Sequence, residues 1–469
     1  MRYTLFVTFF RTLALVGAAV SWPALALNKG AEEILKIAAS YKGQLSISVV
    51  ALSDKAASSE VVSFKSDAPI KPASILKILT SSLVLREFGP DFVFETPIYI
   101  KRVGKETTIT IRGQGDPSLT TEEAWLIARQ IRMRGITEID TLIIDNTAFG
   151  TEARSPIGQR AYQTGPSAMA FNFNSVGFSI CPGEKKNQKA IVSGDPWESG
   201  VTVQNNIITV SGSGEGYSVD EGGGYLSYVL KGKIGEKADC ETFYRSVDAP
   251  GEYFGKTVTK LLSSVGVRVA KEPKIGVVAA DSKKLFTHTS KPLSSIVNDL
   301  NHFSTNFIGE QLVYLLGRKR AGGNERYQFN RGEGVSKLMN YAQELGLKAE
   351  NCVLVDGCGL SHQNKITARV LTAALDVSAK DPSIAPEFET SLAVAAKSGT
   401  LKKRDFIPAT MVLRGKTGTL DGVSSLAGYL YTKQGKKLAF AIIQNGVSSK
   451  NTAIIVEDKL IRALYQLQL

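Results

Sequence analysis

The chain has 469 residues, of which 43% are apolar and 21% are charged, and its formal net charge is +12 at pH 7. A disordered or low-complexity protein is excluded, and at roughly 100–200 residues per domain there is room for about two to four domains. The sequence holds only three histidines and lacks HExxH, CxxC, GxGxxG, GxxxxGK[ST] and GxSxG motifs. These absences argue against zinc, dinucleotide, P-loop and α/β-hydrolase sites.

Residues 1–26 are predicted to be a secretory signal peptide. Two arginines are followed by an apolar run over 12–20, and Pro23-Ala-Leu-Ala26 offers a small-x-small cleavage site. A retained membrane anchor is the weaker alternative, because the uncharged stretch 12–26 is shorter than the ~20 residues that a membrane span needs. The mature chain is therefore expected in the periplasm. There its positive charge suits an acidic wall polymer or a membrane surface rather than nucleic acid.

The first half of the mature chain alternates between α/β and all-β patterns. A helix over 31–39, strands over 45–52 and 61–64 and an apolar helix from Pro72 to Leu85 come first. Residues 94–149 then indicate two strands, a helix over 121–134 and a strand over 139–145. Residues 165–248 are rich in glycine, serine and short alternating runs, which favours an all-β module inserted into this α/β unit.

The second half completes the unit and returns to helices. A helix and a strand over 253–278 resume the α/β pattern. The last 180 residues give helices, three strands over 410–413, 426–432 and 437–444, and a closing helix over 453–467. We expect a mixed α/β (α+β) fold with two nested insertions. Its parts are a main domain of 27–92 and 285–469, an α/β insert of 93–164 and 249–284, and a β insert of 165–248.

Four cysteines fit an oxidising compartment as up to two disulfides, in any of three pairings. We predict a Cys352–Cys358 bridge, because these residues are six positions apart across Asp356-Gly357. The second predicted bridge, Cys181–Cys240, would stabilise a thin β insert that has little hydrophobic core.

Ser74-Ile-Leu-Lys77 is the first motif that could carry chemistry. At a spacing of i,i+3 in the first turns of an apolar helix, the hydroxyl and the amine share one face. A lysine partly desolvated by its apolar neighbours can serve as base for the serine. An isolated pair of this kind is more often a solvated lysine beside a helix-start serine, so the assignment depends on companion motifs.

Two further motifs follow. Ser304-Thr-Asn306 lies between two predicted helices, where a hydroxyl can relay a proton and an amide can hold a peptide carbonyl, although S-x-N also suits a turn or a helix cap. Lys416-Thr417-Gly418-Thr419 comes directly after the strand predicted over 410–413. The glycine there lets a substrate backbone lie along the strand edge.

A competing copy of the last motif begins at Lys397, in Lys397-Ser-Gly-Thr400. It runs straight into Lys402-Lys-Arg404, whereas apolar strands flank the later copy. We therefore interpret the earlier copy as a structural loop.

The order Ser-x-x-Lys, Ser-x-Asn, Lys-Thr-Gly resembles that of the penicillin-recognising serine enzymes. Its details resemble the class-C low-molecular-mass penicillin-binding proteins, the D-alanyl-D-alanine carboxypeptidase/endopeptidase family. The resemblance covers nearly all the mature chain, and it includes Gly113-Gln-Gly-Asp-Pro-Ser-Leu119 and Asp356-Gly-Cys-Gly-Leu-Ser361. That family fills the long gap between its first two motifs with two inserted domains.

The resemblance implies a β-lactamase/transpeptidase-like domain that needs no metal or organic cofactor. Ser74 would be the acylating nucleophile, Lys77 its base, and Ser304 with Lys416 would pass a proton to the leaving D-alanine. The substrate-binding residues would be Asn306, Lys416, Thr417, Gly418 and Thr419, with Asp145 meeting the amino end of a diaminopimelate side chain. The substrate would be a peptidoglycan stem peptide ending in D-Ala, and β-lactams would be inhibitors.

Two positions depart from the family pattern. Cys358 and His362 stand where the family has Ser and Arg in its Asp-Gly-Ser-Gly-Leu-Ser-Arg stretch. The arginine commonly binds the free carboxylate of a diaminopimelate side chain, so His362 leaves that specificity open. Two alternative functions also stay open here, a β-lactamase and a non-catalytic wall-binding protein.

Overall fold

The computed structural model describes residues 29–53, 57–152, 158–222, 226–320, 327–348, 350–404 and 411–469. The predicted signal peptide lies outside these ranges. Within them, no helix is both long enough and apolar enough to cross a membrane.

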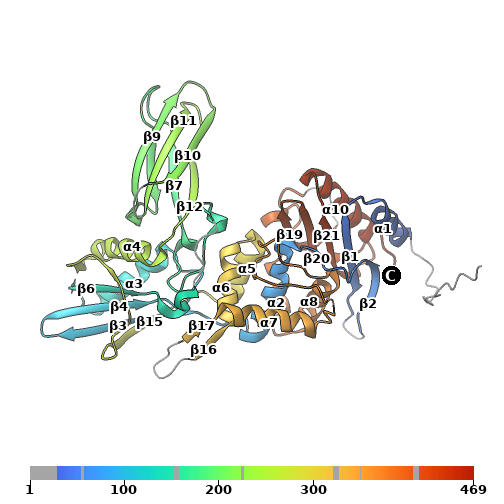
Figure 1. Cartoon of the computed structure of the whole chain (residues 1–469), viewed down its shortest axis with the longest axis horizontal. Coiled ribbons are helices and arrows are strands. Elements are labelled where there is room, and N and C mark those ends of the chain that lie inside the picture. The colour runs from blue at the N-terminus through green and yellow to red at the C-terminus, as the bar shows by residue number, and fades with distance from the viewer. Residues whose placement is uncertain are drawn as a thin grey trace, which may run out of the picture.

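A six-stranded antiparallel sheet forms the centre of the larger part of the molecule, which we call the six-stranded unit (Figure 1). Its strands, in spatial order, are β18 (Ala393–Val394), β19 (Leu413–Leu420), β20 (Val423–Tyr431), β21 (Lys437–Asn445), β1 (Gln44–Ala51) and β2 (Ser59–Phe64). Ala427 and Tyr429 face one apolar cluster, and Leu426 and Leu430 face another. This alternation is the period of two that a sheet buried on both faces requires.

Helices cover both faces of this sheet. α1 (Lys29–Ser40) and α10 (Lys450–Tyr465) pack on one face. The other face carries α2 (Lys77–Phe88), α5 (Leu293–Phe303), α6 (Asn306–Leu316), α7 (Arg331–Glu344), α8 (Ala368–Lys380) and α9 (Ala385–Ser391). The helix predicted from Pro72 to Leu85 is present, but its first turn is the 3₁₀ helix η1 (Ala73–Leu76), and it extends to Phe88.

The five-stranded unit is built on a second, mixed sheet. Its spatial order is β14 (Lys274–Ile275), β6 (Thr141–Asp145), β4 (Glu106–Arg112), β3 (Glu95–Val103) and β15 (Lys283–Thr289), and α3 (Thr121–Met133) and α4 (Pro250–Ser264) pack on it. A short parallel pair, β5 (Glu138–Ile139) with β13 (Arg268–Val269), lies beside it. Because β15 pairs with β3 as far as Thr289, this unit continues past the boundary expected at residue 284.

The β module consists of two three-stranded sheets that project from the five-stranded unit (Figure 1). One holds β10 (Glu215–Glu221), β11 (Ser227–Gly235) and β9 (Thr202–Val210), and the other holds β12 (Glu241–Ser246), β7 (Ser175–Cys181) and β8 (Ile191–Asp195). The described residues between 165 and 248 contain no α-helix. The predicted Cys181–Cys240 disulfide is formed, with the two Cα atoms 4.3 Å apart.

The predicted Cys352–Cys358 disulfide is wrong, because both residues are free thiols. Cys358 is buried against α6, where a side chain on Gly309 would place its Cβ 2.9 Å from the Cβ of Cys358. Cys352 lies beside the β-bridge between Val353 and Lys365 and is partly exposed. The backbone between the two cysteines is held by other contacts, so their closeness in sequence does not bring the sulfur atoms together.

Candidate active site

The turn that carries Ser74 is held from two sides. The Ser425 hydroxyl on β20 donates a hydrogen bond of 2.7 Å to the Pro72 carbonyl. On the other side, Gly359 approaches so closely that a Cβ there would lie 1.9 Å from the Ala73 carbonyl oxygen. Ala73 itself has φ of 52°, a left-handed conformation that costs a non-glycine residue energy and persists only where its surroundings impose it. The backbone of the turn is therefore fixed before any substrate binds.

Lys77 is fully buried one turn after Ser74, and its amine has three oxygen neighbours. The Nζ atom donates to Asn306 Oδ1 at 2.8 Å and to the Cys358 carbonyl at 2.6 Å, and it lies 2.9 Å from Ser74 Oγ. A neutral lysine amine has two N–H groups and one lone pair. When two acceptors hold the N–H groups, the lone pair remains for the Ser74 hydroxyl proton.

Burial lowers the pKa of Lys77 below its usual value, because the charged ammonium form is poorly solvated inside the protein. The negative charges of Asp356 and Glu310 and the nearby Cys358 thiol act in the opposite direction and raise it. Burial is the larger effect, so the neutral amine that can accept a proton is favoured compared with an exposed lysine.

Ser304 and Lys416 meet on the other side of Ser74. Ser304 ends α5 in a left-handed conformation with φ of 63°, and its hydroxyl accepts a hydrogen bond of 2.7 Å from Lys416 Nζ. Lys416 also donates to the Thr417 carbonyl at 2.8 Å and is fully buried. Burial, followed by the charge of Lys77, lowers the pKa of Lys416 well below its usual value.

β19 presents an open edge beside the serine. The Lys-Thr-Gly motif lies within this strand, whereas the sequence pattern predicted it after a strand ending at residue 413. β18 pairs only with Arg414 and Gly415, so among the described residues the edge from Lys416 onward has no strand partner. A side chain on Gly418 would come within 2.9 Å of the Ser74 amide nitrogen, which shows how closely the two segments approach. An extended peptide can add to such an edge through main-chain hydrogen bonds.

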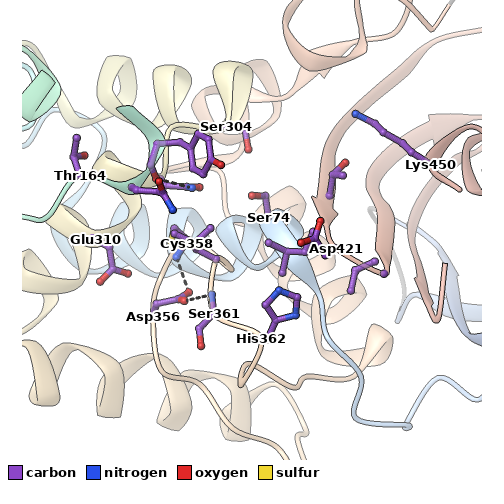
Figure 2. A pocket seen from close by; sticks show the side chains of 18 of the residues that line it. Ser74, Thr164, Ser304, Glu310, Asp356, Cys358, Ser361, His362, Asp421 and Lys450 are labelled. Carbon is purple, nitrogen blue, oxygen red and sulfur yellow. Dashed lines mark hydrogen bonds between the residues drawn. The ribbon is translucent and has the colours of Figure 1, made fainter. Parts of the chain in front are cut away.

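Two buried carboxylates that were not among the predicted site residues hold the loop behind Lys77. Asp356 accepts hydrogen bonds from the backbone amides of Cys358, Gly359 and Ser361, two of which are drawn in Figure 2. Glu310 on α6 accepts from the Gly357 amide and forms an ion pair with Arg331. Burial raises the pKa of Glu310. This loop supplies the Cys358 carbonyl that orients Lys77.

A pocket of about 940 Å³ opens over Ser74. Figure 2 shows Ser74 near its middle, with Glu310 and Asp356 on one side and Asp421 and Lys450 on the other. Ser304, Asn306, Thr419 and His362 also line it. Thr164 adds a wall residue from outside the six-stranded unit, and its buried hydroxyl has no hydrogen-bond partner in the described parts of the chain.

The structure brings most, though not all, of the predicted site residues to one place. Those within this site are Ser74, Lys77, Ser304, Asn306, Lys416, Thr417, Gly418 and Thr419. Asp145 does not line the pocket: it is fully buried, and its carboxylate accepts hydrogen bonds from Thr147 and from the Val278 amide. Lys397, in the competing copy, is exposed in a loop.

Comparison with known proteins identifies the family of this chain. The model of the D-Ala-D-Ala carboxypeptidase 3 (S13) family matches residues 31–464. A D-alanyl-D-alanine carboxypeptidase of Actinomadura sp. is 30% identical over 480 residues, which cover 96% of this chain and 87% of that protein. The D-alanyl-D-alanine carboxypeptidase DacB of Haemophilus influenzae is 22% identical, and the match covers 80% of this chain and 81% of that protein.

Solved structures agree on the fold. The crystal structure of penicillin binding protein 4 (dacB) from Haemophilus influenzae superimposes with a TM-score of 0.74 at 19% sequence identity, covering 92% of this chain and 99% of that one. This likeness confirms the predicted mixed α/β, transpeptidase-like fold class.

Proposed function

This chain belongs to the D-Ala-D-Ala carboxypeptidase 3 (S13) family, and from that premise we infer that it is a serine-type D-alanyl-D-alanine carboxypeptidase that binds penicillin. The single observation that supports this most directly is the environment of Lys77 Nζ, which lies 2.9 Å from Ser74 Oγ and donates to two fixed acceptors. A buried amine held in this way has the geometry of a general base beside a nucleophile.

Acylation follows from these contacts. Ser74 Oγ attacks the carbonyl carbon of the penultimate D-Ala, and the lone pair of Lys77 takes the hydroxyl proton. The bond between this carbon and the terminal D-Ala nitrogen then breaks, and Ser304, hydrogen-bonded to Lys416, passes a proton to the leaving amine. Water afterwards hydrolyses the ester on Ser74. The acyl group leaves as a shortened stem peptide.

Substrate binding uses the open edge of β19. The peptide lies along Thr417–Thr419, Asn306 holds a peptide carbonyl, and Lys416 contributes positive potential for the terminal carboxylate. The backbone N–H groups of Ser74 and Thr419 form the oxyanion hole, where one donor is typically worth ~3 kcal/mol. Asp145 has no part in this binding, because its carboxylate is fully buried away from the pocket.

We further propose a compartment, a second activity and domain boundaries for the chain. The chain acts in the periplasm on peptidoglycan, after removal of residues 1–26, and its endopeptidase activity would cut cross-links that end in the same D-Ala bond. The main domain comprises 27–92 and 285–469, the α/β insert 93–164 and 249–284, and the β insert 165–248. The continuation of β15 to Thr289 supports moving the last α/β boundary to about that residue.

D-Alanine release tests the proposal. An Nα-acylated peptide ending in L-Lys-D-Ala-D-Ala is incubated with the protein, and free D-alanine is measured over time. We expect release by the wild type and none above background by Ser74→Ala at equal folded fraction. Release that survives in Ser74→Ala would remove Ser74 from the mechanism, and no release by the wild type on this peptide or on a diaminopimelate peptide would reject the carboxypeptidase activity.

A further inference from the structure

A second cavity, of about 340 Å³, lies apart from the Ser74 pocket, at the junction between the six-stranded and five-stranded units. Phe92 and Phe94, on the segment entering β3, form one part of its wall. Tyr327 and Phe329 of β17 (Tyr327–Phe329) form another, and Figure 1 shows this strand and β16 (Arg318–Arg320) between the two units. The volume lies within the range of small-molecule sites, and aromatic walls are typical of them.

Gln114 contributes an unpartnered polar group to this cavity. Its side chain is 4% exposed, and its Nε2 atom has no hydrogen-bond partner among the described residues. Its position is fixed, because the Gly113 amide donates to the Asp145 carbonyl at 2.9 Å and the Gly115 amide donates to the Ala168 carbonyl at 2.7 Å. A buried amide left unpaired is unfavourable, and a ligand that accepts its hydrogen bond would recover that loss.

Arg318 supplies further donors at the same place. Its guanidinium lies 3.4 Å from the ring centroid of Tyr327 and 5.6 Å from that of Phe92. Stacking uses the faces of the guanidinium and leaves its N–H edges for an acceptor. None of the described residues forms an ion pair with it. Asp91 and Glu95, both exposed, line the same cavity and can accept hydrogen bonds from hydroxyl groups.

We propose that this cavity binds an N-acylated amino sugar of the peptidoglycan glycan strand, an inference that rests on the proposed function. The aromatic rings pack against the C–H faces of the sugar ring. Gln114 and Arg318 donate to the acyl carbonyl, and the two rim carboxylates accept from sugar hydroxyls.

α6 contributes residues to both sites. Asn306 at the start of this helix contacts Lys77, while Leu315 near its end lines the second cavity. At 1.5 Å per residue these two positions are about 14 Å apart along the axis. At about 100° per residue they also face opposite sides of the helix, so the sugar and the D-Ala end would lie on either side of α6. The second cavity would then make the enzyme prefer polymer-attached peptides to free ones.

Sugar binding to the penicillin-acylated protein tests this proposal, since acylation keeps the probe out of the Ser74 pocket. The probe is the β-1,4-linked trimer of N-acetylglucosamine, titrated calorimetrically. We expect saturable binding to the wild type and at least tenfold weaker binding to Gln114→Leu and to Phe92→Ala. Gln328→Leu is the matched control, because Gln328 is exposed on β17 outside the cavity. It should bind like the wild type.

The outcomes separate this proposal from the proposed function. Penicillin acylation of each variant reports that the Ser74 site is folded. Equal binding by the wild type and both cavity variants, absence of saturable sugar binding, or binding of D-alanine in place of the sugar would each overturn the sugar site. If the chain never reacts with penicillin, the titration is made on the untreated protein, and sugar binding there with the expected variant pattern would support the cavity and reject the proposed function.

Discussion

Lys77 and Lys416 are both buried beside Ser74, and burial lowers the pKa of each below that of a free lysine. A general base works only when deprotonated, so a lowered pKa makes Lys77 active at a lower pH than an exposed lysine would be. The acylation rate should rise as the pH increases through the pKa of Lys77 and reach a plateau below pH 10.5, the ordinary lysine value. The measurement is kcat/KM for a β-lactam against pH. A rate that still climbs through pH 10.5 would contradict a desolvated base.

The two Lys-Ser/Thr-Gly copies can be separated by single substitutions. Lys416→Ala removes the partner of Ser304 and a charge in a desolvated cleft, and the expected loss of transition-state binding is on the order of 2–4 kcal/mol. Lys397→Ala removes an exposed charge worth at most ~1 kcal/mol, so acylation should stay within several-fold of the wild type. Second-order acylation rates are compared at equal folded fraction. If Lys397→Ala greatly lowered the acylation rate while Lys416→Ala left it near the wild-type value, the earlier copy would be the functional one.

Asp116 gives a prediction for stability against pH. Burial raises its pKa from 3.8 to about 6, and one carboxylate oxygen has no hydrogen-bond partner among the described residues. Because the folded pKa lies above the unfolded one, this group favours folding below pH 3.8 and loses that contribution as the pH rises through about 6. The loss corresponds to roughly 3 kcal/mol.

Asp116→Asn removes this titration while keeping an oxygen for Ser118. The free energy of unfolding of the wild type, measured with urea, should therefore fall relative to that of Asp116→Asn between about pH 4 and pH 7. The exposed Asp239→Asn is the control and should follow the wild type. Parallel pH curves for Asp116→Asn and the wild type would show that the Asp116 carboxyl is not desolvated.

At the scale of elements, strands and helices with a strong local pattern were predictable from sequence. β21, α3 and the closing helix lie within a few residues of their predicted ranges, because each combines periodic apolar residues with polar ends. β19 was not placed correctly. Its stretch Arg414-Gly-Lys-Thr-Gly has little apolar character. It forms a β-strand because β20 pairs with it along its whole length. Local patterns do not reveal such a partner.

Part of the candidate site was likewise predictable from the sequence, and part was not. Ser74 and Lys77 share one helix face, so their contact follows from spacing alone. Glu310 and Asp356 were missed, since their roles depend on α6 and a distant loop meeting behind Lys77. The quoted motif Asp356-Gly-Cys-Gly-Leu-Ser361 was the only signal that could have pointed to this loop. For Cys358 the sequence instead suggested a contact that does not form. Its nearness to Cys352 in sequence predicted a disulfide, but Cys358 is buried against α6 and both thiols are free.

For the whole molecule, the β module should be removable without loss of the Ser74 chemistry. Ser175 and Ser246 are paired at the base of β7 and β12, so residues 176–245 can be replaced by two glycines. None of the described residues of this segment belongs to the two apolar clusters around the six-stranded sheet. The shortened protein should be acylated by penicillin within several-fold of the wild-type rate. Loss of acylation, with unfolding of the remaining chain, would show that the module supports the site.

The most direct test of the account is the identity of the residue that penicillin acylates, and the lifetime of the adduct. The wild-type protein is treated with benzylpenicillin, and intact mass and peptide mapping are followed over time. We predict one long-lived penicilloyl adduct on the peptide that contains Ser74, and none in Ser74→Ala. An adduct on another residue, no adduct at all, or rapid turnover of the drug as in a β-lactamase would contradict the account.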